Sequence, residues 1–152
     1  MLIVYANNET SKANLSEEIK HRGIDPSRLI FGDSLPKPKY LARYRTADLF
    51  LDTHPYNAGT TASDALKMGL PIVSMMGQSF NSREAASILT SMNLPELITN
   101  SLEEYEALAI ELATNPEKMQ AIKDKLASNL TCLLYTSPSP RDRTRSRMPS
   151  SA

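Results

Sequence analysis

The sequence predicts an α/β fold of the Rossmann type, built on a parallel sheet. Short apolar runs alternate with helical patterns from residue 2 to residue 92, and such alternation is typical of parallel sheets with crossover helices. The apolar fraction of 41% and the charged fraction of 22% are those of a globular protein. No run reaches the roughly 18 apolar residues that a membrane-spanning helix needs.

Strands are expected where four short apolar runs occur, at residues 2–5, 29–31, 49–51 and 71–75. Helices are expected between and after them, at residues 11–22, 38–46, 61–68 and 82–92. Two of these helices are followed by glycines, Gly23 and Gly69, which commonly end helices because they adopt the left-handed conformation.

After Pro95 the pattern becomes mostly helical. Ser101 and Glu104 have the spacing of a capping box, in which each side chain accepts from a free backbone amide. Asn115 precedes Pro116, an N-cap followed by proline at the first helical position. Two apolar stripes then support two helices: Leu102, Tyr105, Leu108 and Leu112, and Met119, Ile122 and Leu126.

Composition excludes several classes of function. Seventeen basic and seventeen acidic residues give a net charge of zero, so nothing global favours nucleic acid or an anionic membrane as a partner. One cysteine, Cys132, excludes a disulfide framework, and two histidines build a zinc centre only with carboxylates. The first six residues are too short for a signal peptide and lack a basic lead-in, so a cytoplasmic protein is expected.

The zero net charge hides an asymmetry. Residues 133–152 hold four arginines and one aspartate, a charge of +3, which leaves 13 basic and 16 acidic groups, a charge of −3, in residues 1–132. The end of the chain is also rich in proline and serine, so residues 132–152 are expected to form a disordered basic tail. This tail is either a basic linker or a segment foreign to the protein.

The candidate site lies in the loops after the second and third predicted strands, because ligands bind outside the carboxyl ends of parallel strands. Gly59, Thr60 and Thr61 stand at a predicted helix start, where backbone amides, two hydroxyls and the positive dipole end suit a phosphate. Four further side chains would complete a nucleotide site: Asp64 for a ribose hydroxyl, Lys37 and Arg43 for charge, and Tyr40 for a base.

Each of these residues also has a simpler interpretation. Thr61 with Asp64 is equally a plain helix cap. Lys37 and Lys39 are of a type that is more often solvated than ligand-binding, and Tyr40 and Tyr44 suit half-buried packing. His54 lies in a loop without an evident partner, which favours a structural or solvent-facing role over that of a general base. The residues alone indicate an anion-binding site in an α/β domain.

Two long segments carry a family resemblance. The runs RYRTADLFLDT (43–53) and PYNAGTTASDAL (55–66) resemble the C-terminal catalytic half of the protein O-GlcNAc transferase family, glycosyltransferase family 41, whose bacterial members are often called SPINDLY-like. The match continues through residues 69–73, 77–80, 82–87, 94–98 and 103–105. It covers about residues 1–131, and residues 57–64 are its most specific part.

The resemblance implies that residues 1–131 form part of the C-terminal lobe of a two-lobed GT-B glycosyltransferase. Such enzymes transfer GlcNAc from UDP-GlcNAc to Ser or Thr of proteins, with inversion and without a required metal or other cofactor. The implied partners are a UDP-sugar and protein acceptors. Two alternatives remain: a related UDP-glucose-dependent protein glucosyltransferase, and a non-catalytic nucleotide- or anion-binding α/β module.

Six UDP-binding residues follow from the resemblance: Lys37, Tyr40, Arg43, Thr60, Thr61 and Asp64. Lys37 matches a lysine near the uridine and the diphosphate, and Tyr40 stands where some members have a histidine beside the uracil. Thr60 and Thr61 match the pair at the diphosphate, and Asp64 matches the acid near the ribose. Gly59 departs from the family, because animal members have a histidine there.

The resemblance also implies that the chain begins inside the C-terminal lobe. The family's TPR repeats, its N-terminal lobe with the proposed catalytic histidines, and a glutamine and a lysine that help to bind UDP all lie upstream. We therefore expect no catalytic residue in this chain and no activity of the chain alone. The string CLLYTSPSPRDR (132–143) resembles translated library-adapter sequence, which favours an artefact as the source of the tail.

Overall fold

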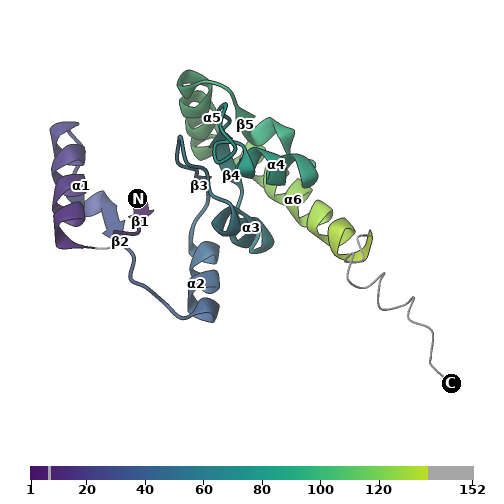
Figure 1. The fold of residues 1–152 in the computed structure, drawn as a ribbon, viewed down its shortest axis with the longest axis horizontal. Coiled ribbons are helices and arrows are strands. Elements are labelled where there is room, and N and C mark those ends of the chain that lie inside the picture. The colour runs from purple at the N-terminus through teal and green to yellow at the C-terminus, as the bar shows by residue number, and fades with distance from the viewer. Residues whose placement is uncertain (7, 137–152) are drawn as a thin grey trace. The chain divides into compact units, whose positions relative to one another are not determined.

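A computed structural model describes residues 1–6 and 8–136, which form two compact units divided between Tyr40 and Leu41 (Figure 1). The strands are parallel, as predicted, and they pair within two sheets, one in each unit. Among the described residues no helix is both long and apolar enough to cross a membrane.

The first unit is built on strands β1 (Leu2–Val4) and β2 (Leu29–Phe31), which pair in parallel with Leu2 opposite Leu29. Helix α1 (Glu9–His21) and a 3-10 turn, η1 (Pro26–Arg28), connect the two strands. The helix begins earlier than predicted, because the Asn8 side chain caps it by accepting from the Ser11 amide at 2.7 Å.

Left-handed residues end three helices in the same way. Gly23 has a φ of 74°, and the next amide, that of Ile24, donates back to the Ile19 carbonyl at 2.9 Å. Gly69 ends its helix likewise with a φ of 81°, so both predicted glycine stops are confirmed. Asn93 does the same with a φ of 54°, and this stop was not predicted because asparagine is a less distinctive stop signal than glycine.

Helix α2 (Lys37–Arg43) and a 3-10 turn, η2 (Tyr44–Thr46), together match the helix predicted near 38–46. The second unit then alternates strands and helices. Its elements are β3 (Phe50–Leu51), α3 (Thr60–Lys67), β4 (Ile72–Met75), α4 (Glu84–Ser91), η3 (Pro95–Leu97), β5 (Ile98–Thr99), α5 (Leu102–Thr114) and α6 (Pro116–Thr136). The three strands form a parallel sheet in the order β3–β4–β5, so β4 lies in the middle.

Strand β5 was not predicted. It has only two residues, Ile98 and Thr99, which pair with Ser74 and Met75 of β4. So short a segment shows no periodicity of its own, and the pairing with β4 defines it. Thr99 is buried, and its hydroxyl donates to the Ser74 carbonyl at 3.2 Å.

The hydrophobic core lies in the second unit, around β4. Residues Ile72, Val73 and Ser74 are all fully buried, and α3, α4 and α5 contact this strand. Fifteen residues form one core cluster: Ala62, Ala65, Leu66, Leu70, Ile72, Val73, Ala85, Leu89, Met92, Leu94, Leu97, Leu112, Met119, Ile122 and Leu126. The four helices α3, α4, α5 and α6 all contribute members to this cluster, so α5 and α6 belong to the fold of this unit.

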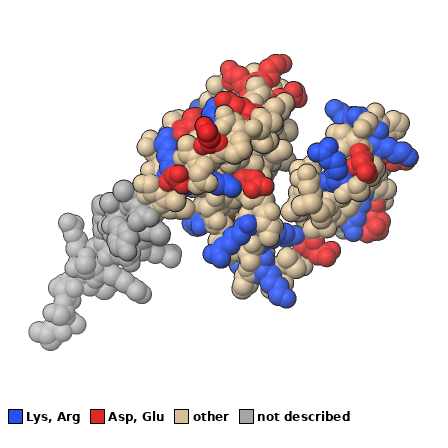
Figure 2. All heavy atoms as spheres, turned by 180° about the vertical axis from the view of Figure 1, so that it is seen from behind, with Lys and Arg blue, Asp and Glu red and all other residues tan. Residues whose placement is uncertain are grey.

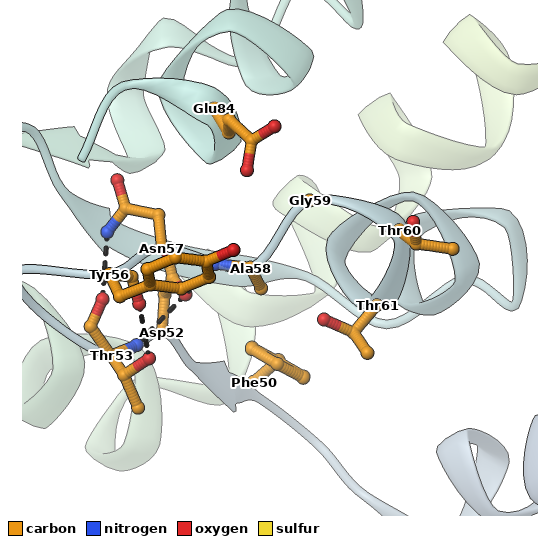
Figure 3. Close-up of a pocket in the computed structure, with 10 residues that line it drawn as sticks. All are labelled: Phe50, Asp52, Thr53, Tyr56, Asn57, Ala58, Gly59, Thr60, Thr61 and Glu84. Carbon is orange, nitrogen blue, oxygen red and sulfur yellow. Dashed lines mark hydrogen bonds between the residues drawn. The ribbon is translucent and has the colours of Figure 1, made fainter. Parts of the chain in front are cut away.

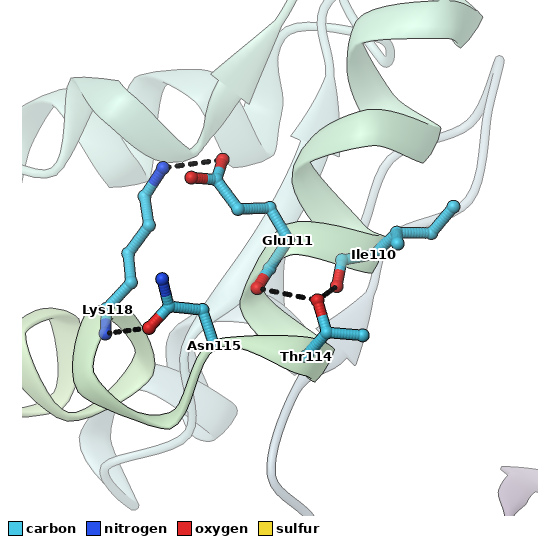
Figure 4. A network of polar contacts seen from close by, with 5 residues as sticks. All are labelled: Ile110, Glu111, Thr114, Asn115 and Lys118. Carbon is cyan, nitrogen blue, oxygen red and sulfur yellow. Dashed lines mark hydrogen bonds and ion pairs between the residues drawn. The ribbon is translucent and has the colours of Figure 1, made fainter.

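A polar network fixes the junction of α5 and α6 (Figure 4). The Asn115 side chain accepts from the Lys118 amide at 3.0 Å, which confirms Asn115 as the N-cap of α6. The Lys118 ammonium lies 2.6 Å from the Glu111 carboxylate. At the previous junction, Ser101 accepts from the Glu104 amide at 3.2 Å and the Glu104 carboxylate accepts from the Asn100 amide at 2.8 Å. The reciprocal bond thus starts from Asn100, whereas a standard capping box would use the Ser101 amide.

Helix α6 continues past residue 132, where the disordered tail was predicted to begin, and ends at Thr136. After Pro116 no proline or glycine interrupts the chain before Pro138, so no residue forces the helix to stop at 131. The remainder of the tail predicted for 132–152, namely residues 137–152, lies outside the described residues.

Candidate functional site

A hollow of about 490 Å³ lies where the loop after β3 leads into α3. Its walls come from β3, this loop, the first turn of α3 and the start of α4 (Figure 3). The lining residues are Phe50, Asp52, Thr53, Tyr56, Asn57, Ala58, Gly59, Thr60, Thr61 and Glu84. The carboxyl end of a parallel strand and the start of a helix meet there, as they do at ligand sites of open α/β sheets.

Asp52 holds this loop together. Its carboxylate is buried and accepts from the amides of Thr53 and Ala58 at 2.9 and 2.8 Å, and from the Ser74 hydroxyl at 2.6 Å. Burial raises the pKa of Asp52, and these three hydrogen bonds oppose the rise. The carboxylate therefore ties the loop to β4 as a structural acceptor.

Tyr105 of α5 makes a further contact with Asp52, through the backbone of that residue. Its hydroxyl donates to the Asp52 backbone carbonyl at 2.9 Å. Burial, together with the charge of Asp52, raises the pKa of Tyr105 to about 12. The residue was predicted only as a member of an apolar stripe, and it does pack against the core while its hydroxyl anchors the strand end.

Asn57 is fully buried in the lining. Its side-chain amide donates to the Thr53 carbonyl at 2.8 Å, which closes the loop between them. Its side-chain oxygen is buried without a hydrogen-bond partner. A buried acceptor without a partner costs about 1–3 kcal/mol, so this oxygen is an energetic cost within the loop.

The start of α3 settles one of the alternatives left open by the sequence. The helix begins at Thr60, and Gly59 is its N-cap, with no side-chain capping bond. Thr61 therefore lies in the first turn, and the interpretation of Thr61 with Asp64 as a plain helix cap is wrong. The first amides of α3 have no intrahelical partner, and they lie beside the hollow that Thr60 and Thr61 line.

The predicted site residues come from α2 and α3. Thr60 and Thr61 both line the hollow, and Asp64 follows one turn further along α3, where it is half-buried. Lys37 and Tyr40 belong to the first unit, where the Lys37 ammonium lies 5.3 Å from the centre of the Tyr40 ring. Arg43 is the last residue of α2 and belongs to the second unit.

Two further residues match their simpler interpretations. Tyr44 is half-buried against the core, with its ring centre 6.3 Å from that of Phe50. His54 is exposed in the loop after β3, and a Cβ atom at Gly77 would lie 3.1 Å from its Cε1 atom. No hydrogen bond to His54 is found within residues 1–6 and 8–136 that would prepare it as a general base.

Sequence reasoning missed Glu84 of the lining. It stands at the start of α4, where an acid is expected for its favourable interaction with the helix dipole, and nothing in the sequence connects it with Gly59. Within the part of the chain that the structure describes, no group of three or more His, Cys, Asp or Glu side chains is arranged to hold a metal ion. Both signs of charge are present on the face of the second unit drawn in Figure 2.

Comparison with known sequences gives one family match. The model of glycosyl transferase family 41 matches residues 2–136. A probable UDP-N-acetylglucosamine–peptide N-acetylglucosaminyltransferase, SEC of Arabidopsis thaliana, is 39% identical over 116 residues, which are 75% of this chain and 12% of the relative. The UDP-N-acetylglucosamine–peptide N-acetylglucosaminyltransferase of Caenorhabditis elegans is 36% identical over 105 residues, 69% of this chain and 9% of the relative.

A solved structure is similar as well. A mutant O-GlcNAc transferase of Thermobaculum terrenum superposes with a TM-score of 0.84 at 28% sequence identity, over 89% of this chain and 26% of that chain. The chain thus spans about a tenth of the two sequence relatives and about a quarter of the solved structure.

Proposed function

The chain belongs to glycosyltransferase family 41, and we propose that it binds the UDP part of UDP-GlcNAc in an inverting enzyme that transfers GlcNAc to Ser or Thr of proteins. One observation carries the proposal: two threonines at the uncapped start of α3 line a hollow of about 490 Å³. The names of the relatives, which are UDP-N-acetylglucosamine–peptide transferases, support the choice of donor and acceptor.

Transfer of the sugar requires groups that stabilise negative charge on the departing UDP, and the start of α3 offers such groups. When an acceptor hydroxyl attacks the anomeric carbon, the bond from that carbon to the diphosphate oxygen breaks, and its electron pair stays on the departing UDP. Backbone amides and hydroxyls aimed at that charge stabilise it in the transition state. In the proposal the first-turn amides of α3 and the hydroxyls of Thr60 and Thr61 have this role.

The remaining assignments complete the nucleotide site. Asp64 accepts from a ribose hydroxyl, Lys37 and Arg43 add positive charge, and Tyr40 lies against the uracil. The proposal needs no metal ion, and it assigns no catalytic residue to this chain. The proton of the acceptor hydroxyl passes to a base elsewhere in the enzyme, which we propose to act in the cytoplasm on a UDP-sugar and protein acceptors.

Calorimetry with UDP tests the proposal. We expect the 152-residue chain to bind UDP, and replacement of both Thr60 and Thr61 by alanine to weaken binding at least tenfold, because hydrogen bonds to charged groups contribute about 1.5–3 kcal/mol each. Asp64→Ala should weaken binding less, because it removes an acceptor from a neutral hydroxyl.

Thr114→Ala is the matched control, since Thr114 is an exposed threonine near the end of α5 whose hydroxyl bonds only backbone carbonyls. It should bind UDP as the unmodified chain does. If the variant with both threonines replaced keeps full UDP affinity, the start of α3 does not bind the diphosphate as proposed.

A second expectation concerns catalysis. The 152-residue chain should not transfer GlcNAc from UDP-GlcNAc to an acceptor peptide, because the proposal assigns it part of the donor site and no general base. Mass spectrometry of the peptide after long incubation measures this, with a full-length enzyme of the family as positive control. A mass increase of one GlcNAc with the chain alone would show that a catalytic group lies within it.

A further inference from the structure

The carboxylate of Glu84 lies directly over Gly59. A Cβ atom built on Gly59 would be 3.0 Å from Oε2 of Glu84, 3.3 Å from Cδ and 3.4 Å from Oε1. Figure 3 shows Glu84 reaching from the start of α4 toward the backbone that leads into α3. The φ of Gly59 is −98°, outside the left-handed region that favours glycine, so a φ above zero does not account for glycine here. The space that glycine leaves is what the carboxylate occupies.

This carboxylate has no protein partner that accounts for its position. Within residues 1–6 and 8–136 no hydrogen bond or ion pair engages Glu84, although it is half-buried and lines the hollow. Interaction with the dipole of α4 favours an acid in the first turn. That interaction explains the residue type, but it does not require the side chain to lie over Gly59.

The chemistry of the lining limits what Glu84 can bind. An ionised carboxylate accepts hydrogen bonds and donates none. A diphosphate offers only acceptor oxygens and negative charge, so the Glu84 carboxylate would repel it, and the first-turn amides and hydroxyls of α3 remain its proposed partners. A sugar hydroxyl is a neutral donor, and a charged acceptor makes a strong hydrogen bond to it.

We propose that Glu84 recognises the sugar of the donor, by accepting a hydrogen bond from a sugar hydroxyl next to the diphosphate at the start of α3, and that Gly59 provides the space this carboxylate needs. The inference rests on the proposed function, because it takes the nucleotide sugar to be the ligand of the hollow. It adds a specificity residue on α4 to a site otherwise formed by the loop and α3.

The test compares two ligands on the 152-residue chain by calorimetry. UDP reports binding of the nucleotide alone, and UDP-GlcNAc reports nucleotide and sugar, so the ratio of the two affinities isolates the contribution of the sugar. Glu84→Ala should weaken UDP-GlcNAc roughly tenfold or more, since a hydrogen bond to a charged group is lost. UDP itself should bind equally well or more tightly, because a negative charge near the phosphates is removed.

Two variants sharpen the assignment. Glu84→Gln keeps an acceptor oxygen and should retain part of the sugar preference. Gly59→Ala places a Cβ atom 3.0 Å from Oε2, so the carboxylate must shift by a few tenths of an ångström, and a smaller loss confined to UDP-GlcNAc is expected. Glu103→Ala is the control, because Glu103 is an exposed acid in the first turn of α5 and should affect neither ligand.

The outcomes separate the inference from the proposed function. If the unmodified chain binds UDP but shows no difference between UDP and UDP-GlcNAc, or if Glu84→Ala changes both affinities by the same factor, the sugar role of Glu84 is overturned and the nucleotide site stands. If the chain binds neither ligand while circular dichroism shows it folded, the proposed function fails and the inference fails with it.

Discussion

Asp52→Ala is expected to lower the free energy of unfolding by roughly 3–5 kcal/mol, because several buried donors lose their acceptor at about 1–3 kcal/mol each. The donors are the amides of Thr53 and Ala58 and the hydroxyl of Ser74. Denaturant titration followed by circular dichroism measures the change. The same variant should lose UDP binding even where it remains folded, since the Ala58 bond fixes the backbone that enters α3.

Asp52→Asn separates the acceptor from the charge. Asparagine keeps one side-chain oxygen for the two amides and offers its NH2 group to the Ser74 hydroxyl oxygen, so a loss near 1 kcal/mol is expected. Asp48→Ala is the surface control. The Asp48 carboxylate is 92% exposed, and its ion pair with Lys123, at 3.7 Å, is of the solvent-exposed kind that contributes little to stability. An unfolding midpoint of Asp52→Ala equal to that of Asp48→Ala would contradict the structural role of Asp52.

Leu126→Ala is expected to destabilise the second unit by roughly 2–5 kcal/mol, the range for truncating a fully buried leucine. Leu126 has no exposed surface and belongs to the core cluster, although it lies on α6, the last helix within the described residues. Two polar contacts hold the same helix in place: the Asn129 side chain donates to the Met92 carbonyl at 2.8 Å, and Lys125 lies 2.6 Å from Glu96.

Ile110→Ala is the matched control for this helix experiment. Ile110 is 63% exposed on α5, so its truncation should change the free energy of unfolding by about 0.5 kcal/mol or less. Chemical unfolding of both variants at the same protein concentration gives the comparison. Equal stabilities of the Leu126 and Ile110 variants would mean that α6 does not pack on the core in solution.

Features that depend on neighbours along the chain were predictable. Gly23 and Gly69 stop their helices and Asn115 starts α6 as expected, because each makes its hydrogen bonds to residues within a few positions. The helix ranges follow for the same reason, since a stripe of apolar residues at helical spacing is visible in the sequence itself. The division of the chain at residue 131 into a lobe and a foreign tail stays a prediction.

Features that depend on distant residues were not predictable. Strand β5 is defined by its pairing with β4, and two residues carry no pattern. The bond from Ser74 to Asp52 spans 22 positions and that from Tyr105 to Asp52 spans 53, so neither leaves a local trace. The interpretation of Thr61 as a helix cap could be removed only when the structure placed the start of α3 at Thr60.

The sequence by itself determined the α/β class, because propensity, capping and periodicity act over a few residues. The family followed from a long resemblance, whose most specific part, residues 57–64, overlaps the predicted site. Only the tertiary structure decided which polar groups meet around that segment. It brought Glu84 against Gly59, left the Asn57 oxygen without a partner and buried Asp52 beneath the loop. These are contacts between separate elements, which form when the helices pack around β4.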